Sequence, residues 1–80
     1  MELTVSVNAD LGVRLAAVRR LQGLTQRELA HRMGVTKGRI SQIEQGKVSG
    51  SEVIARYAEA LGGKLQQTIH FRDGSAFWIN

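Results

Sequence analysis

A run of small and apolar residues between positions 30 and 43 constrains this chain more than any other feature of its sequence. Ala30, Gly34, Ile40 and Ile43 follow one another at intervals of four, six and three residues. An alanine lets two helices cross closely, a glycine in a short turn allows a positive φ, and the two isoleucines direct the second helix inward. The spacing therefore predicts two short helices that meet at a sharp angle, which is a helix-turn-helix arrangement.

Capping signals extend this pattern to four helices. Thr25 and Glu28 form a T-x-x-E capping box, and Ser49 and Glu52 form a second box of the S-x-x-E type. Glycines, which readily adopt the left-handed conformation of a C-cap, follow each of the helical segments. The expected helices run from Leu11 (after an Asp10 N-cap) to Gln22, from Gln26 to Met33, from the Thr36 cap to Gly46, and from the Ser49 cap to Gly62.

Beyond residue 63 the apolar period changes from 3.6 to 2, which is typical of strands. Asp73-Gly74 is a signal for a two-residue type I′ turn. That turn predicts a hairpin in which Phe71 lies opposite Ala76 and Ile69 opposite Trp78, with the apolar side chains on one shared face. A two-stranded hairpin is marginally stable in water, so this face needs a cover.

Length and composition favour a single mainly α domain with few accessory features. We expect an N-terminal arm over 1–10, a helical domain over 11–63 and a C-terminal β-hairpin over 64–80; the arm contains a short β-prone segment, Leu3–Val7, whose role stays open. The 80 residues include no cysteine, which excludes disulfide scaffolds, zinc-thiolate sites and thiol nucleophiles. Neither a membrane-spanning apolar stretch nor a signal peptide is evident, so we expect a cytoplasmic protein with no membrane partner.

The positive charge is concentrated in the helical part of the chain. The net charge is +4, but residues 11–47 hold eight basic residues against two acidic ones and so carry +6. The segments 1–10 and 48–80 carry −2 and 0. This distribution suggests an anionic partner, with nucleic acid first and an anionic membrane second. A solvated basic surface without a partner is the alternative.

Several short motifs in the helical part belong to a known pattern. They are Arg19, Gly23-Leu24-Thr25-Gln26, Glu28-Leu29-Ala30, Gly34-Val35-Thr36, Ile40-Ser41-Gln42-Ile43-Glu44, Gly46-Lys47 and Ala58-Glu59-Ala60-Leu61-Gly62. Through these motifs, residues 11–62 resemble the lambda-repressor/Cro-like (XRE) family of helix-turn-helix regulators. The resemblance implies a compact four-helix fold that binds double-stranded DNA. The chain departs from the family in the loop 46–51, which lacks the usual proline, and in carrying a hairpin where many members have a fifth helix.

The helix over 36–45, which would lie in the major groove, presents a polar and basic face opposite Ile40 and Ile43. The candidate DNA-binding residues are Gln26, Thr36, Lys37, Gly38, Arg39, Ser41, Gln42, Gln45 and Lys47. Lys37 could reach guanine acceptors or a phosphate, and Gln42 could pair with adenine. The resemblance implies a base-reading side chain at Gly38, where this chain has none. Ordinary solvated surface is the alternative for each candidate, and the sequence favours it for Arg14, Arg20 and Arg32.

Arg19 and Glu44 each lie about 70° from the centre of the apolar stripe of their helix, at 100° per residue. Both therefore point to the rim of the core. The resemblance implies that these two residues pair across the domain. Because such a pair would be architectural, we exclude both from the DNA-reading residues.

The sequence predicts a sequence-specific transcriptional regulator, a repressor that binds a two-fold operator as a homodimer. The expected dimer or partner interface is the hairpin; its residues are Leu65, Ile69, Phe71, Phe77 and Trp78. Packing of the hairpin on the fourth helix of the same chain is the alternative. Two other functions stay open: an antitoxin that neutralises a protein toxin and autoregulates its operon, and an adaptor with an inert basic face.

Catalysis finds little support in the sequence. Carboxylates are sparse, and neither a phosphate-binding glycine loop nor a metal-ligand cluster is evident. His31 and His70 are expected on the surface. We therefore expect a protein that is not an enzyme and that needs no cofactor and no metal.

Overall fold

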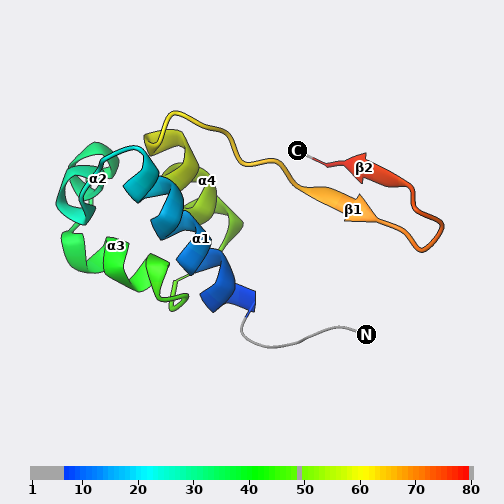
Figure 1. Ribbon diagram of the computed structural model, residues 1–80, viewed down its shortest axis with the longest axis horizontal. Helices are drawn as coiled ribbons and strands as arrows, with labels where there is room; N and C mark the ends of the chain where they lie inside the picture. The colour runs from blue at the N-terminus through cyan, green and yellow to red at the C-terminus, as the bar shows by residue number, and fades with distance from the viewer. Residues whose placement is uncertain (1–6, 49, 80) are drawn as a thin grey trace.

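A computed structural model describes residues 7–48 and 50–79 of the chain. The elements are α1 (Val7–Leu21), α2 (Gln26–Met33), α3 (Lys37–Glu44), α4 (Ser51–Ala60), β1 (Thr68–His70) and β2 (Ala76–Trp78). The four helices form a compact bundle, and the hairpin of β1 and β2 projects from one end of it (Figure 1). The predicted mainly α fold with a C-terminal hairpin is confirmed. No helix within the described ranges has the length and apolar character that crossing a bilayer requires.

The predicted starts of α2 and α3 are confirmed by their caps. At α2, Thr25 Oγ1 accepts a hydrogen bond from Glu28 N (3.0 Å), and Thr25 N donates to Glu28 Oε1 (2.8 Å). At α3, Thr36 Oγ1 accepts from the backbone N of Arg39 (3.1 Å). Gly34, between the two helices, has a φ of 69° and ends α2 in the left-handed conformation. These contacts set the sharp turn that orients α3 against α2.

The starts of the other two helices differ from the prediction. Helix α1 begins at Val7, so Asp10 lies inside the helix and is not its N-cap. An acidic residue is favourable within the first turn as well as at the N-cap, so it does not fix the first residue of a helix. The N-cap of α4 is Gly50, which makes no side-chain cap hydrogen bond, and the predicted cap Ser49 lies outside the described residues. Residues 3–6 of the β-prone segment also lie outside them.

The core forms where α2, α3 and α4 meet, and α1 closes it. Its buried residues are Leu29, Ala30, Ile40, Ile43, Ile54 and Tyr57, and Leu65, in the segment between α4 and β1, packs against them from the edge. Helix α1 approaches the end of α3 at Gly12, where a Cβ would lie 2.3 Å from the carbonyl oxygen of Glu44. That close approach requires glycine and brings the backbone of α1 against α3.

The predicted register of the hairpin is wrong by one residue. Ile69 lies opposite Phe77 and Thr68 opposite Trp78, and the loop spans the three residues 72–74. The loop closes because Asp73 Oδ1 accepts hydrogen bonds from the backbone N and the Oγ of Ser75, while Gly74 takes a φ of 93°. A shift of one residue moves a side chain to the other face of a strand. Trp78 therefore does not share a face with Ile69.

The hairpin consequently carries two different apolar faces. One face, called here the phenylalanine face, consists of Ile69, Phe71, Phe77 and Ile79; the rings of Phe71 and Phe77 pack edge to face with centroids 5.9 Å apart. The other face carries Trp78, of which 72% is exposed. All four members of the phenylalanine face are also exposed. Packing of the hairpin on α4 of its own chain is not observed, because the hairpin extends away from the bundle (Figure 1).

Candidate nucleic-acid interface

Helix α3 has a buried inner face and an exposed outer face. Ile40, Ile43 and Glu44 are buried against the core. The outer side chains are solvent-accessible; they are Lys37, Gly38, Arg39, Gln42, Gln45 and the half-buried Ser41, with Thr36 and Lys47 exposed at the two ends. Gln45 Nε2 donates to Ser41 Oγ (2.9 Å), which orients both side chains on this surface. The structure thus brings eight of the nine candidate DNA-binding residues together along one helix.

Gln26, the ninth candidate, lies at the first position of α2, and its side chain is half-buried. Its Nε2 donates to Glu44 Oε1 (2.9 Å), so this hydrogen bond holds the Gln26 amide against the C-terminal end of α3. The backbone N–H groups in the first turn of a helix have no partner within the helix and favour an anion. Gln26 therefore connects the buried carboxylate of Glu44 to the N-terminal end of α2.

Arg19, Glu44 and Tyr57 form a buried polar network that holds three helices in register. Arg19 Nε donates to Glu44 Oε2 (2.7 Å) and Arg19 Nη2 donates to Oε1 (3.0 Å), a bidentate ion pair between α1 and α3. The Tyr57 hydroxyl of α4 donates to the same carboxylate. Every buried side-chain polar atom among the described residues has a hydrogen-bond partner. The network holds α3 by its buried inner face and involves no side chain of its outer face.

The ionisation of Glu44 reflects this network. Burial alone would raise the pKa of its carboxyl group, but hydrogen bonds from Arg19, Tyr57 and Gln26 together outweigh burial and hold the pKa below its ordinary value. Burial and the neighbouring carboxylate raise the pKa of the Tyr57 hydroxyl. Glu44 is therefore ionised and Tyr57 is neutral at neutral pH.

Two arginines lie beside α3: Arg20, for which the sequence favours solvated surface, and Arg27, for which the sequence makes no specific prediction. Arg20 lines a shallow hollow together with Gln26, Ser41 and Gln45. Arg27 lines an adjacent one together with Lys37. The signal for Arg20 is its spacing, because Gly12, Ala16 and Arg20 stand at i, i+4 and i+8 on the face of α1 that meets α3. Both cations add to the positive charge around the outer face of α3.

Arg32 lies elsewhere, where α2 meets α4. Its Nη1 donates to the carbonyl oxygen of Ala60 at the end of α4 (3.1 Å). In the opposite direction, Arg56 Nη2 donates to the carbonyl oxygen of Met33 at the end of α2 (3.2 Å). Each arginine thus satisfies a terminal carbonyl of the neighbouring helix. This reciprocal pair is structural and lies away from the outer face of α3.

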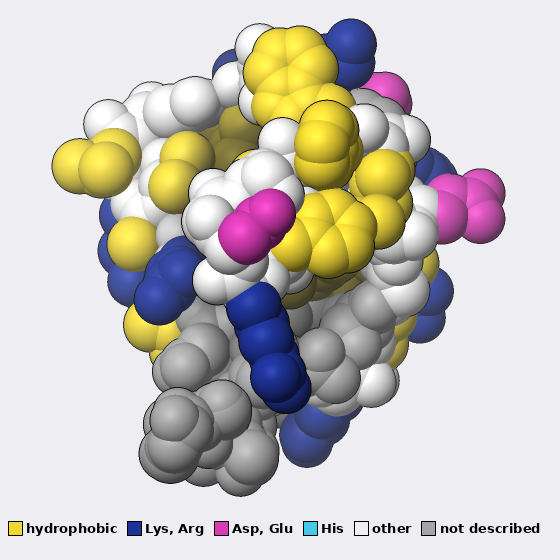
Figure 2. All heavy atoms as spheres, turned by 90° about the vertical axis from the view of Figure 1, so that its right-hand side faces the viewer, with side chains coloured by type: hydrophobic (Ala, Val, Ile, Leu, Met, Phe, Trp, Pro, Cys, Tyr) yellow, Lys and Arg dark blue, Asp and Glu magenta, His cyan; other side chains and the backbone are white. Residues whose placement is uncertain are grey.

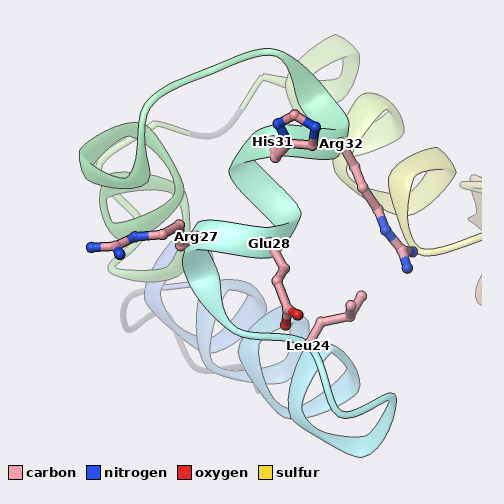
Figure 3. Close-up of a pocket in the computed structure, with 5 residues that line it drawn as sticks. All are labelled: Leu24, Arg27, Glu28, His31 and Arg32. Atoms are coloured by element: carbon pink, nitrogen blue, oxygen red, sulfur yellow. The ribbon is translucent and has the colours of Figure 1, made fainter.

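The exposed side of α2 forms a hollow of about 410 Å³, and its lining residues are Leu24, Arg27, Glu28, His31 and Arg32. Its polar side chains do not converge: Arg27 and Arg32 point in opposite directions, and Glu28 points toward Leu24 (Figure 3). Glu28 is also held by its cap contact with Thr25. Within the described ranges, no three His, Asp or Glu side chains lie close enough together to hold a metal ion.

A short turn between two crossed helices, a buried inner face and a polar, basic outer face together define a helix-turn-helix DNA-binding unit. The family model described as Helix-turn-helix matches residues 15–67. The chain belongs to this family, which confirms the resemblance drawn from its motifs.

Three proteins that are similar to this chain have a name or description that states a function. A protein of Mycobacterium tuberculosis named as antitoxin HigA2 is 36% identical over 62 residues, which are 75% of this chain but only 61% of that protein. The clp gene regulator ClgR of Corynebacterium glutamicum has a solved structure that matches with a TM-score of 0.71 and 32% identity, over 81% of this chain and 85% of that one. A HigA antitoxin, described for DNA bending induced by its unique dimerization, matches with a TM-score of 0.69 and 25% identity over 98% of this chain and 97% of that one.

Proposed function

We propose that this protein is a sequence-specific transcriptional regulator, a repressor, that acts in the cytoplasm. The observation that carries the proposal is the outer face of α3, where basic and amide side chains are exposed on a helix whose opposite side is fixed by the core and by Glu44. A rigid helix of this kind can enter the major groove and present its side chains to base edges. The clp gene regulator ClgR shares the fold over most of the chain.

The proposed contacts divide into base reading and positioning. Lys37 and Gln42 reach base edges from the outer face of α3. Gln26 and Arg20 bind phosphates from the ends of α2 and α1, and Lys47 does so beyond α3. The side-chain contact of Gln26 with Glu44 couples the phosphate site to the orientation of α3.

The first experiment selects bound duplexes from genomic fragments and measures dissociation constants at several salt concentrations. Lys37→Ala and Gln42→Ala should each weaken operator binding by about 10- to 100-fold, which corresponds to about 1–3 kcal/mol. Lys64→Ala is the matched control, since it removes the same charge from the segment after α4, where Lys64 lies beside residues of α1 and α4 and not of α3. It should change affinity by less than about threefold. Binding that is insensitive to salt, or equal losses for all three variants, would contradict the proposal.

We propose in addition that the protein binds a two-fold operator as a homodimer, and that the phenylalanine face of the hairpin forms the dimer contact. The exposed fractions of Ile69, Phe71, Phe77 and Ile79 lie between 44% and 60%, which is unusual for four adjacent apolar side chains. Figure 2, which views the molecule from the hairpin end, shows the hydrophobic side chains gathered there. The likeness to the HigA antitoxin described for its dimerization extends over the hairpin. Leu65 contributes less, because it packs against the core of its own chain.

Light scattering during size exclusion tests the dimer contact. Phe77→Ser should give a monomer, whereas Trp78→Ser, at the next residue but on the opposite face, should remain a dimer. Circular dichroism should show the same helical content for both variants, because the hairpin lies outside the helical core. A Phe77→Ser variant that is a dimer, or a Trp78→Ser variant that is a monomer, would assign the contact differently.

A second candidate function is an antitoxin that neutralises a protein toxin and represses its own operon. The similarity to proteins named as HigA antitoxins supports it. So does the hairpin, because dimerisation through the phenylalanine face would leave the face with Trp78 free for another protein. The test expresses each gene that flanks this one, alone and together with the chain. Growth arrest that the wild type relieves and Trp78→Ser does not would establish this function; no arrest by any flanking gene would exclude it.

A further inference from the structure

The two glycines inside the described helices, Gly12 and Gly38, differ in whether the packing of the chain leaves room for a side chain. At Gly12 an added Cβ would lie 2.3 Å from a backbone oxygen, so the fold itself requires glycine. At Gly38, in the first turn of α3, an added Cβ would meet only Thr36 Oγ1, at 3.8 Å, which is an ordinary contact. The φ of Gly38 also lies outside the left-handed region. Neither packing nor backbone conformation within the chain calls for glycine at position 38.

Glycine at this position works against the helix that contains it. It is the least helix-favouring residue apart from proline, and α3 has only eight residues in which to offset that loss. Close approach of the backbone to a ligand is one of the uses of glycine in proteins, and it is the use that remains where neither packing nor φ requires glycine. Gly38 is exposed on the outer face of α3, between Lys37 and the side chains of Ser41 and Gln42. The partner proposed for that face is the major groove of DNA.

The chemistry of the groove limits what can lie against Gly38. In the direction of the missing Cβ, the residue presents only a Cα–H group. A donor or acceptor on a base edge, pressed against that group, would lose its water and find no hydrogen-bond partner. The methyl group of thymine is the one apolar group that projects into the major groove, and it has no hydrogen bond to lose. It also fills about the volume that a Cβ would occupy.

We propose that Gly38 is a specificity-determining residue that accepts a thymine methyl group against the backbone of α3. The proposal rests on the proposed DNA-binding function and adds the base that is read at this position. Glycine selects the base by leaving space for its methyl group, while Lys37 and Gln42 read neighbouring bases through their side chains. Any larger residue at position 38 would occupy the space of the methyl group.

The experiment combines a protein change with a DNA change of the same size. Starting from the selected operator, each thymine is replaced in turn by deoxyuridine, which lacks only the methyl group, and dissociation constants are measured for the wild type and Gly38→Ala. At one thymine of each half-site, deoxyuridine should weaken the wild type several-fold. Gly38→Ala should weaken binding to the thymine operator about tenfold or more, and much less than that on the deoxyuridine operator.

Two outcomes would overturn the proposal. The first is a Gly38→Ala variant that binds the thymine operator as tightly as the wild type. The second is a loss of affinity in Gly38→Ala that is the same on every deoxyuridine duplex, which would indicate a clash with the DNA backbone. The deoxyuridine scan of the wild type needs no variant, so the proposal can be tested even if Gly38→Ala folds poorly. If the wild type binds no duplex in a salt-dependent manner, the proposed function fails, and this result is separate from either outcome.

Discussion

Replacement of Gly12 by alanine tests whether the close approach of α1 and α3 holds the domain together. The added Cβ would lie 2.3 Å from the carbonyl oxygen of Glu44 and 2.9 Å from that of Ile43. Both are backbone atoms that cannot rotate away, so α1 must move outward. Arg19, on the same helix, pairs with Glu44 at 2.7 Å, so an outward movement also strains this buried ion pair.

The magnitude follows from opposing contributions. Overpacking a tight contact costs about 1–3 kcal/mol, and complete loss of one partner of a buried ion pair costs about 3–5 kcal/mol. Alanine in place of glycine within a helix returns up to about 1 kcal/mol. With about half of the ion-pair loss included, these contributions give a net loss of about 2–4 kcal/mol for Gly12→Ala. A domain of this size has a total stability of about 4–12 kcal/mol, so the loss is large.

Urea and thermal unfolding followed by far-ultraviolet circular dichroism provide the assay. Circular dichroism is preferred because the single tryptophan, Trp78, lies in the hairpin and does not report on the helical core. The expected loss lowers Tm by about 8–30 °C. Gly38→Ala is the matched control, since the same substitution in a helix with open space should leave stability unchanged or raise it by up to about 1 kcal/mol. A Gly12→Ala variant as stable as the wild type would refute the reasoning.

Three further predictions concern the polar contacts of the helical domain. The folded-state pKa of Glu44 lies below its ordinary value, so the carboxylate stabilises the fold above about pH 4.5 and loses this effect as the pH falls through the folded pKa. Urea midpoints of the wild type should therefore fall over that pH range, and those of Glu44→Gln should change less. Tyr57→Phe removes a hydrogen bond to a charged group and should lower the unfolding free energy by about 1.5–3 kcal/mol in urea titrations, with no loss expected if the hydroxyl were hydrated. Thr25→Ala removes the cap of α2 and should cost about 1 kcal/mol, whereas an unchanged midpoint would mean that water replaces the cap.

The sequence predicts helix boundaries well where a side chain closes a specific hydrogen bond. The capping box of Thr25 and Glu28 and the cap at Thr36 each tie one side chain to one backbone donor, so only one start satisfies them. At Asp10 and Gly50 the signal is weaker. An aspartate favours the first turn as well as the N-cap, and several small residues in a row can each precede a helix. Where several starts are nearly equal in energy, tertiary contacts decide among them.

Prediction of the candidate interface had a similar limit. The outer face of α3 follows from its helical period, because the inner face is marked by two isoleucines. The sequence does not single out Arg20, because the role of this residue depends on which side of α1 meets α3. That information was present as Gly12 and Ala16 on the same face as Arg20, but small residues reveal a close approach only when the partner helix is known. Contacts between elements are less accessible to sequence reasoning than the elements themselves.

The hairpin shows how one local interaction alters the surface that a chain offers to its partners. Asp73-Gly74 fits either a two-residue or a three-residue loop, and both hydrogen bonds from Ser75 to the Asp73 carboxylate favour the longer one. The shorter loop would put Ile69 and Trp78 on one apolar face. The longer loop separates them, so that the phenylalanine face and the face with Trp78 can bind different partners at the same time. The proposed dimer contact and the proposed contact with a second protein are therefore separable by single substitutions at adjacent residues, Phe77 and Trp78, which a hairpin with one shared face would not allow.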